Sequence, residues 1–121
     1  MVKRTMLLIG LGALSLLAAC GTETDARPVT LAYITPTILR PSCAGGACHS
    51  TLSKTAGYAF DTVKHVREGM QDGELVNLSV PDDSLLMRVL VGDGVPRMPP
   101  DGPLPDKDLD LVETWIREGA Q

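Results

Sequence analysis

The chain has 121 residues with a formal net charge of −4, and only four of its residues are aromatic. It has no basic stripe, which argues against nucleic acid as a partner. A chain of this length forms one domain with a thin apolar core, and such small domains often need a disulfide, a metal or a cofactor for stability.

The N-terminus has the pattern of an export signal. Lys3 and Arg4 precede an apolar stretch of 14 residues, 6–19. That stretch is shorter than the about 20 residues that a membrane-spanning helix needs, and it fits the apolar region of a signal peptide. We therefore predict a signal peptide over residues 1–19. Its removal would leave 9 basic against 15 acidic residues.

The signal ends in Leu17-Ala18-Ala19-Cys20, which resembles the lipobox of bacterial lipoproteins. The resemblance implies that Cys20 is acylated and becomes the new N-terminus; an ordinary signal peptide with a chance Cys is the alternative. Each buried CH₂ of an acyl chain contributes about 0.8 kcal/mol, so several chains form a stable anchor. We expect a lipidated tether over 20–29 and a membrane-anchored location facing the periplasm or the cell surface. Gly21 in place of Asp favours the outer membrane.

The first predicted helix of the mature chain lies within residues 30–39. Leu31, Ile34 and Ile38 have helical spacing. Pro36 interrupts this pattern, so the helix either kinks there or starts afresh with Thr35 as its N-cap. Gly45 and Gly46 predict a loop afterwards, because each interior Gly costs a helix about 1 kcal/mol relative to Ala.

Three further segments complete the predicted fold. Residues 50–60 have the pattern of an irregular loop, and 61–68 that of a short helix capped by Asp61 and stopped by Gly69. A helix is predicted after Pro81-Asp82-Asp83-Ser84, ending at Gly92. The proline-rich segment 95–105 excludes regular structure, and 106–118 predicts the strongest helix, with Asp106 as cap and Gly119 closing it. No stretch alternates as a strand does, so the domain 30–121 is predicted to be all-α.

The most informative motif is Cys43-Ala-Gly-Gly-Ala-Cys48-His49. A pair of thiols followed at once by an imidazole is typical of haem attachment, where the usual motif is C-x-x-C-H. Here four residues separate the cysteines. A disulfide would close a loop too short to stabilise much and would leave His49 unexplained. Zinc could take Cys43, Cys48, His49 and His65, but exported thiols tend to oxidise. Haem is the favoured interpretation.

An electron-carrying haem needs a second axial ligand, often the thioether of Met. Met98 lies in Arg97-Met98-Pro99-Pro100, where the prolines stiffen the backbone at low entropic cost. It is the favoured candidate, although it could instead cover a hydrophobic edge. His65 is an alternative sixth ligand. Met70 and Met87 have ordinary interpretations as exposed or core residues.

From about residue 33 to 121 the chain resembles small monohaem cytochromes c. The resemblance rests on a helix leading into Cys43…Cys48-His49, on the helix start Pro81-Asp82-Asp83-Ser84-Leu85-Leu86, and on Met98-Pro99-Pro100 followed by a terminal helix with Trp115-Ile116. It implies thioethers from Cys43 and Cys48 to haem c, His49 as proximal iron ligand and Met98 as distal ligand. It also implies an all-α fold in which the N- and C-terminal helices pack together. The wide cysteine spacing departs from the usual motif and is similar to a known variant.

These observations predict a membrane-tethered electron carrier that works with redox partner proteins and is not an enzyme. An enzyme such as a haem peroxidase is disfavoured, because the chain is too short for a substrate domain and a filled sixth site suits peroxide chemistry poorly. The alternative from another class is a haem-free lipoprotein with a Cys43–Cys48 disulfide, acting as a structural or interaction module.

Overall fold

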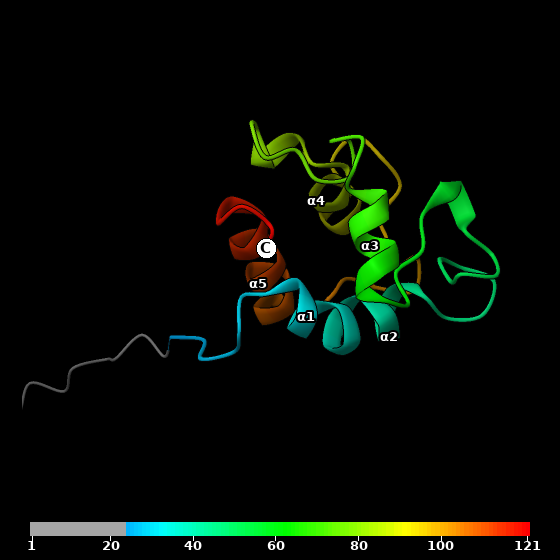
Figure 1. Cartoon of the computed structure of the whole chain (residues 1–121), viewed down its shortest axis with the longest axis horizontal. Coiled ribbons are helices and arrows are strands. Elements are labelled where there is room, and N and C mark those ends of the chain that lie inside the picture. The colour runs from blue at the N-terminus through cyan, green and yellow to red at the C-terminus, as the bar shows by residue number, and fades with distance from the viewer. Residues whose placement is uncertain (1–23) are drawn as a thin grey trace, which may run out of the picture.

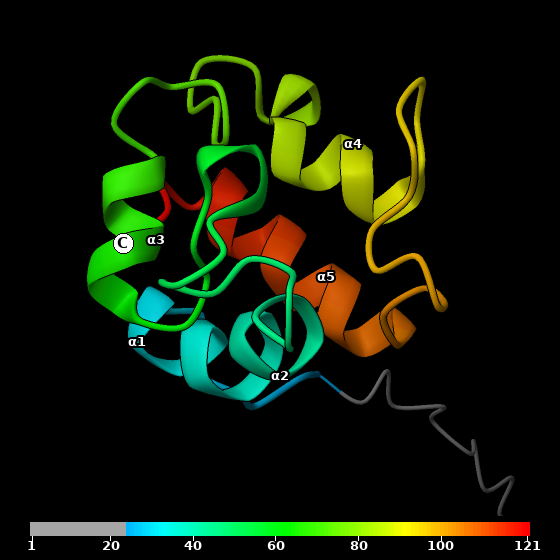
Figure 2. The same ribbon diagram turned by 90° about the vertical axis from the view of Figure 1, so that its right-hand side faces the viewer.

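The computed structural model describes residues 24–121, and within them the regular structure is helical, without strands. The predicted all-α class is therefore confirmed. Figure 1 shows the order of the helices along the chain, and Figure 2 shows α5 behind the other helices, with the α1–α2 segment below α4.

The first helical segment is continuous through Pro36. It comprises α1 (Leu31–Ile34), a π-helical turn (Thr35–Leu39) and α2 (Arg40–Cys43), and Thr30 caps its start. The alternative in which a helix restarts with Thr35 as N-cap was wrong. Because proline has no N–H and its ring crowds the preceding turn, the helix widens here, and the Arg40 N–H donates to the Thr35 carbonyl.

The third helix, α3, spans Val63–Gly69. Its N-cap is Thr62, whose hydroxyl accepts a hydrogen bond from the His65 backbone N–H at 3.2 Å. The prediction of Asp61 as cap was therefore wrong by one residue. The Asp61 carboxylate instead accepts hydrogen bonds from Thr51, across the loop.

The predicted helix start at Pro81 is a 3₁₀ turn, Pro81–Asp83, followed by α4 (Leu85–Val91). Ser84 joins the two elements; it is buried, and its hydroxyl accepts the Asn77 N–H at 2.9 Å. Gly92 ends α4 in the left-handed conformation, with φ +78°, as its sequence position predicted.

The last helix, α5 (Asp106–Arg117), begins one residue earlier than a cap at Asp106 would require, because Pro105 occupies the N-cap position. The prediction of Asp106 as cap was therefore wrong by one residue. Gly119 follows its end with φ +98°. The end of the chain returns to the start of α1, where the Gln121 carbonyl accepts the Leu31 N–H at 2.8 Å and the Trp115 indole N–H at 3.0 Å. The first and last helices therefore lie against each other, as expected.

One buried apolar cluster joins α1, the π-helical turn, α3, α4 and α5. Its fully buried members come mainly from α1, the π-helical turn, α4 and α5. At roughly 25 cal/mol per Å² of apolar surface, a cluster of this kind is the main stabilising contribution available to so small a domain. It includes Leu31, Ile34, Ile38, Leu39, Val66, Leu86, Leu90, Val112, Trp115 and Ile116.

Residues 24–29 run along the domain without regular structure. Arg27 fastens them, since its guanidinium bonds to the carboxylates of Asp25 and Asp108 and to the Lys107 carbonyl. The predicted signal peptide and Cys20 lie outside the described residues. Within 24–121, no helix has the length and apolar character needed to cross a membrane.

Candidate functional site

A cavity of about 590 Å³ opens beside the end of α2. Cys43, Cys48, His49 and Met98, the four residues singled out from the sequence, all line it. A volume of this size is within the range of ligand sites. The rest of its wall is mainly apolar and comes from the loops and from α4, including Tyr58, Phe60, Leu75, Leu85, Leu86, Val89 and Leu90.

The two cysteines are free thiols with different surroundings. Cys43 is the last residue of α2 and is half-buried, whereas Cys48 is exposed on the loop. Burial raises the pKa of Cys43 to about 11, and the neighbouring Cys48 contributes in the same direction. In this structure the pair therefore does not form the disulfide of the alternative interpretation.

The segment between the cysteines is a compact loop, as Gly45 and Gly46 predicted. The His49 N–H donates to the Cys43 carbonyl at 3.0 Å, so the chain returns to the helix end within six residues. Thr55 supports the loop from outside, because its hydroxyl lies 2.8 Å from the Cys48 carbonyl, to which it donates. This closure keeps Cys43, Cys48 and His49 close together in the wall of the cavity.

His49 is oriented by its backbone and by Phe60. Its carbonyl accepts the Phe60 N–H at 2.8 Å, and the two rings meet edge to face with centroids 5.2 Å apart. The ring nitrogen Nδ1 is buried and has no hydrogen-bond partner among the described residues. The side chain is therefore held by packing and by main-chain bonds, without a hydrogen bond to Nδ1.

Met98 approaches the cavity from the proline-rich loop after α4. Its N–H donates to the Val89 carbonyl at 2.7 Å, which ties the loop to the helix. The other two methionines of the described residues do not line the cavity. Met87 is in the core, and Met70 packs partly buried against it, so Met70 is less exposed than its ordinary interpretation assumed.

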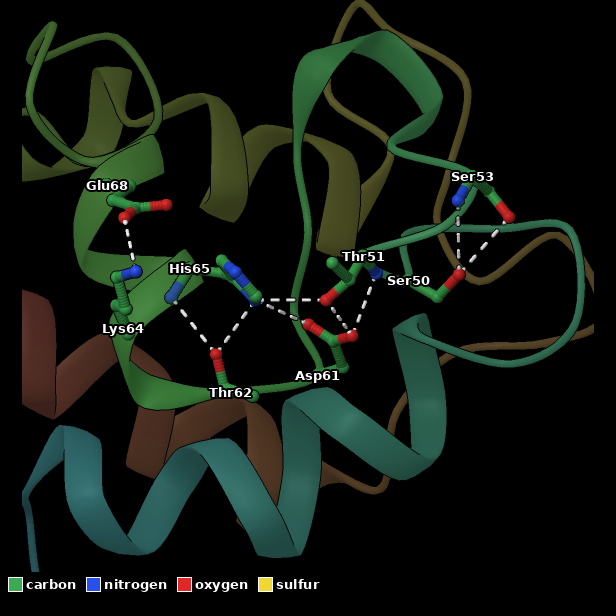
Figure 3. A network of polar contacts seen from close by, with 8 residues as sticks. All are labelled: Ser50, Thr51, Ser53, Asp61, Thr62, Lys64, His65 and Glu68. Atoms are coloured by element: carbon green, nitrogen blue, oxygen red, sulfur yellow. Dashed lines mark hydrogen bonds and ion pairs between the residues drawn. The ribbon is translucent and has the colours of Figure 1, made fainter.

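His65 lies away from the cavity lining, in a polar network with Thr51, Asp61 and Thr62 (Figure 3). Across residues 24–121, no three side chains of His, Cys, Asp or Glu gather as metal ligands. The described structure therefore does not bring Cys43, Cys48, His49 and His65 together as a zinc site. His65 does not line the cavity, where a sixth haem ligand would have to lie.

The residues that hold segment 43–51, the motif loop, were not predicted from the sequence. Thr55 and Phe60 were placed in an irregular loop, and Asp61 was interpreted only as a helix cap. One signal was available in the sequence. Asp61 and Thr62 are adjacent, and either can cap a helix, so the one that does not cap can make another contact.

Residues 46–102 match a protein-family model described as Planctomycete cytochrome C. The matched segment includes Cys48, His49 and Met98 and begins after Cys43. No curated protein and no solved structure matches the chain. The match supports a cytochrome c-like domain, for which covalently bound haem c with its iron is the implied cofactor and haem-binding electron transfer the implied function.

Proposed function

We propose that this chain is a monohaem electron carrier, anchored to a membrane of the cell envelope through Cys20. The observation that carries the proposal is the convergence of two free thiols, one imidazole and one thioether on a single apolar cavity.

The donor set suits haem c. The thiols of Cys43 and Cys48 would form the two thioethers, His49 would bind the iron on one side, and Met98 on the other. When bound, the haem supplies one-electron chemistry. Because both axial positions would be filled by the protein, no position would remain for a substrate, which suits an electron carrier better than an enzyme.

The chain's own residues would set the properties of such a site. The apolar walls from α4 and from Phe60 would shield a bound haem from water. A Met thioether is a soft ligand and favours a higher reduction potential. Gly45 and Gly46 meet no neighbouring atom within 4 Å of an added Cβ, so the wide four-residue spacing can bulge outward without a clash.

The proposed partners are redox proteins that meet the domain outside the cytoplasm. The acidic surplus after removal of the signal would favour approach of a basic partner, an effect that weakens at high salt. The membrane location depends on acylation of Cys20, with the outer membrane preferred.

The direct test is production of the full chain together with a c-type haem maturation system. The expected product is red, and its haem stays with the polypeptide through denaturing electrophoresis. A protein in which Ser replaces both Cys43 and Cys48 should lose the covalent haem. The matched control is Cys20→Ser, which should keep the haem and lose the membrane anchor. A colourless protein with an oxidised Cys43–Cys48 pair would reject the proposal and favour the haem-free lipoprotein.

A further inference from the structure

No side chain or main-chain group among residues 24–121 accepts a hydrogen bond from the ring of His49 at Nδ1. A metal-binding histidine ordinarily donates its second ring N–H to a carboxylate, a carbonyl or water, which fixes the ring. The Nδ1 atom of His49 is buried without a partner among the described residues. Among the described residues, the contacts that orient the ring are therefore that with the Phe60 ring and those of the backbone on either side.

That backbone is fastened by the segment that precedes α3. The Phe60 N–H donates to the His49 carbonyl at 2.8 Å. One residue further, the Asp61 carboxylate accepts both the Thr51 N–H, at 2.8 Å, and the Thr51 hydroxyl. Residues 49–51 are thus bound to residues 60–61 at two consecutive points, which restricts rotation of the backbone that carries the imidazole.

The carboxylate is itself oriented from α3, as Figure 3 shows. Asp61 Oδ1 lies 3.0 Å from His65 Nδ1, and because a carboxylate only accepts, the His65 ring donates this bond. The two side chains are only 24% and 20% exposed, so water competes weakly for their contacts. The hydrogen bonds from Thr51, and then that from His65, hold the pKa of Asp61 below its usual range, so it is ionised at neutral pH.

A simple helix-capping role does not account for Asp61. Thr62 caps α3, and the Asp61 carboxylate is turned toward the motif loop. We infer that Asp61 is a positioning residue for the haem-binding histidine, acting through Thr51 and oriented by His65. This inference rests on the proposed function, because it assigns the network to the iron site.

The test compares Asp61→Ala with Asp61→Asn in the full, haem-loaded chain. Both remove the same negative charge, but Asn keeps one oxygen that can accept the Thr51 N–H. The readouts are the reduction potential and the charge-transfer absorption of the thioether–ferric iron bond, measured where the helical circular dichroism is unchanged. We expect Asp61→Ala to increase the fraction lacking this absorption several-fold, with Asp61→Asn in between. The exposed Asp110→Asn, a matched loss of charge on α5, should behave as the original protein. Identical behaviour of the two Asp61 variants would overturn the inference.

A second measurement separates this inference from the proposed function. In the haem-free chain, hydrogen exchange of the Thr51 amide should be several-fold faster in Asp61→Ala than in the original protein. Equal exchange rates would show that Asp61 does not hold this segment, even if haem is attached. If the original protein carried no covalent haem, the proposed function would fail and the positioning role with it.

Should Asp61→Ala not fold, Thr51→Val takes its place, because it removes the hydroxyl and keeps the amide. It should shift the reduction potential and the charge-transfer absorption in the same direction as Asp61→Ala, but by less.

Discussion

At the residue scale, Met98 has the most specific predicted role. Met98→Ala should leave the haem attached, lower the reduction potential by on the order of 0.1 V within the ~0.8 V range that axial ligands span, and open the sixth position. The potential should fall because the variant loses a soft ligand that stabilises ferrous iron. Potentiometry would measure the potential, and binding of an added ligand such as imidazole would show the open sixth position.

Met87→Leu is the control for this experiment, because Met87 is buried in the core and does not line the cavity. It should leave the potential and the ligand binding unchanged. If Met98→Ala matched Met87→Leu in both measurements, Met98 would have no role at the iron.

The two cysteines should differ in reactivity before haem attachment. A thiol whose pKa is raised from 9 to about 11 has roughly a hundredfold less thiolate at pH 8 than an ordinary one, and only the thiolate reacts. Cys48 is exposed. Brief alkylation of the reduced, haem-free chain, followed by peptide mass spectrometry, should therefore label Cys48 well before Cys43. Equal labelling in folded protein would contradict the burial of Cys43, and urea-unfolded chain should label both alike.

The residues that bear haem-binding groups could be predicted from the sequence, whereas their supports could not. Cys43, Cys48 and His49 belong to one short motif, and Met98 lies in a proline-rich loop, so residue type and local sequence singled them out. Thr55, Phe60 and Asp61 act through hydrogen bonds to main-chain groups of the motif loop. Such contacts depend on the path of the loop, which periodicity and caps do not encode.

At the element scale, the end of α4 controls the approach of the Met98 loop. Gly92 has φ +78°, and a Cβ added there would lie 3.3 Å from the Arg97 Cβ. A left-handed residue other than Gly costs about 1–2 kcal/mol, partly offset by the lower chain entropy of Ala when unfolded. Gly92→Ala should therefore lower the free energy of unfolding by about 1 kcal/mol in urea titrations.

Gly102→Ala is the matched control in the same loop. An added Cβ there meets nothing within 4 Å, and the backbone is outside the left-handed region. It should change stability by less than about 0.5 kcal/mol. Equal effects of the two substitutions would mean that the conformation at Gly92 does not limit the helix end.

The helices were predictable where apolar spacing and a stop residue agree. The helix ends near Gly92 and Gly119 could be predicted because the apolar spacing stops where the glycine begins. A helix cap was predicted one residue away from its true position where two candidates were adjacent, as at Asp61 and Thr62. At Pro36 the sequence left open whether the helix kinks and continues or starts afresh, because the local effect of a proline does not decide between these outcomes. The buried Ile34, Ile38 and Leu39 contribute to one core on both sides of it, and their packing favours a widened turn over a break.

At the scale of the whole molecule, the core and the cavity share α4. Leu86 and Leu90 belong to the buried cluster and also line the cavity. The all-α class could be predicted because no segment alternates, but this sharing is a property of the three-dimensional packing. A group bound in the cavity would therefore stabilise the entire fold by mass action, since it binds the folded state alone.

Acid stability should depend on two carboxylates held by polar contacts. The pKa of Asp25 is lowered to about 2, chiefly by the Arg27 side chain, and that of Asp61 is lowered chiefly by the Thr51 hydroxyl. In unfolded chains an Asp titrates near about 3.9. A group whose pKa is lower when folded stabilises the protein above its unfolded pKa, and this contribution is lost as the pH falls through the folded value.

These two groups therefore contribute fully between pH 7 and 5, and their contribution decreases from about pH 4 downward. Urea unfolding followed by circular dichroism at pH 7, 5, 4 and 3 should show the fall in stability beginning near pH 4. A double variant, Asp25→Asn with Asp61→Asn, should start from a lower stability at pH 7 and lose less on acidification. Asp110→Asn, which changes the same type of residue at an exposed position, should keep the original pH profile. If the double variant lost as much stability between pH 5 and 3 as the original protein, acid sensitivity would have to come from groups other than these two.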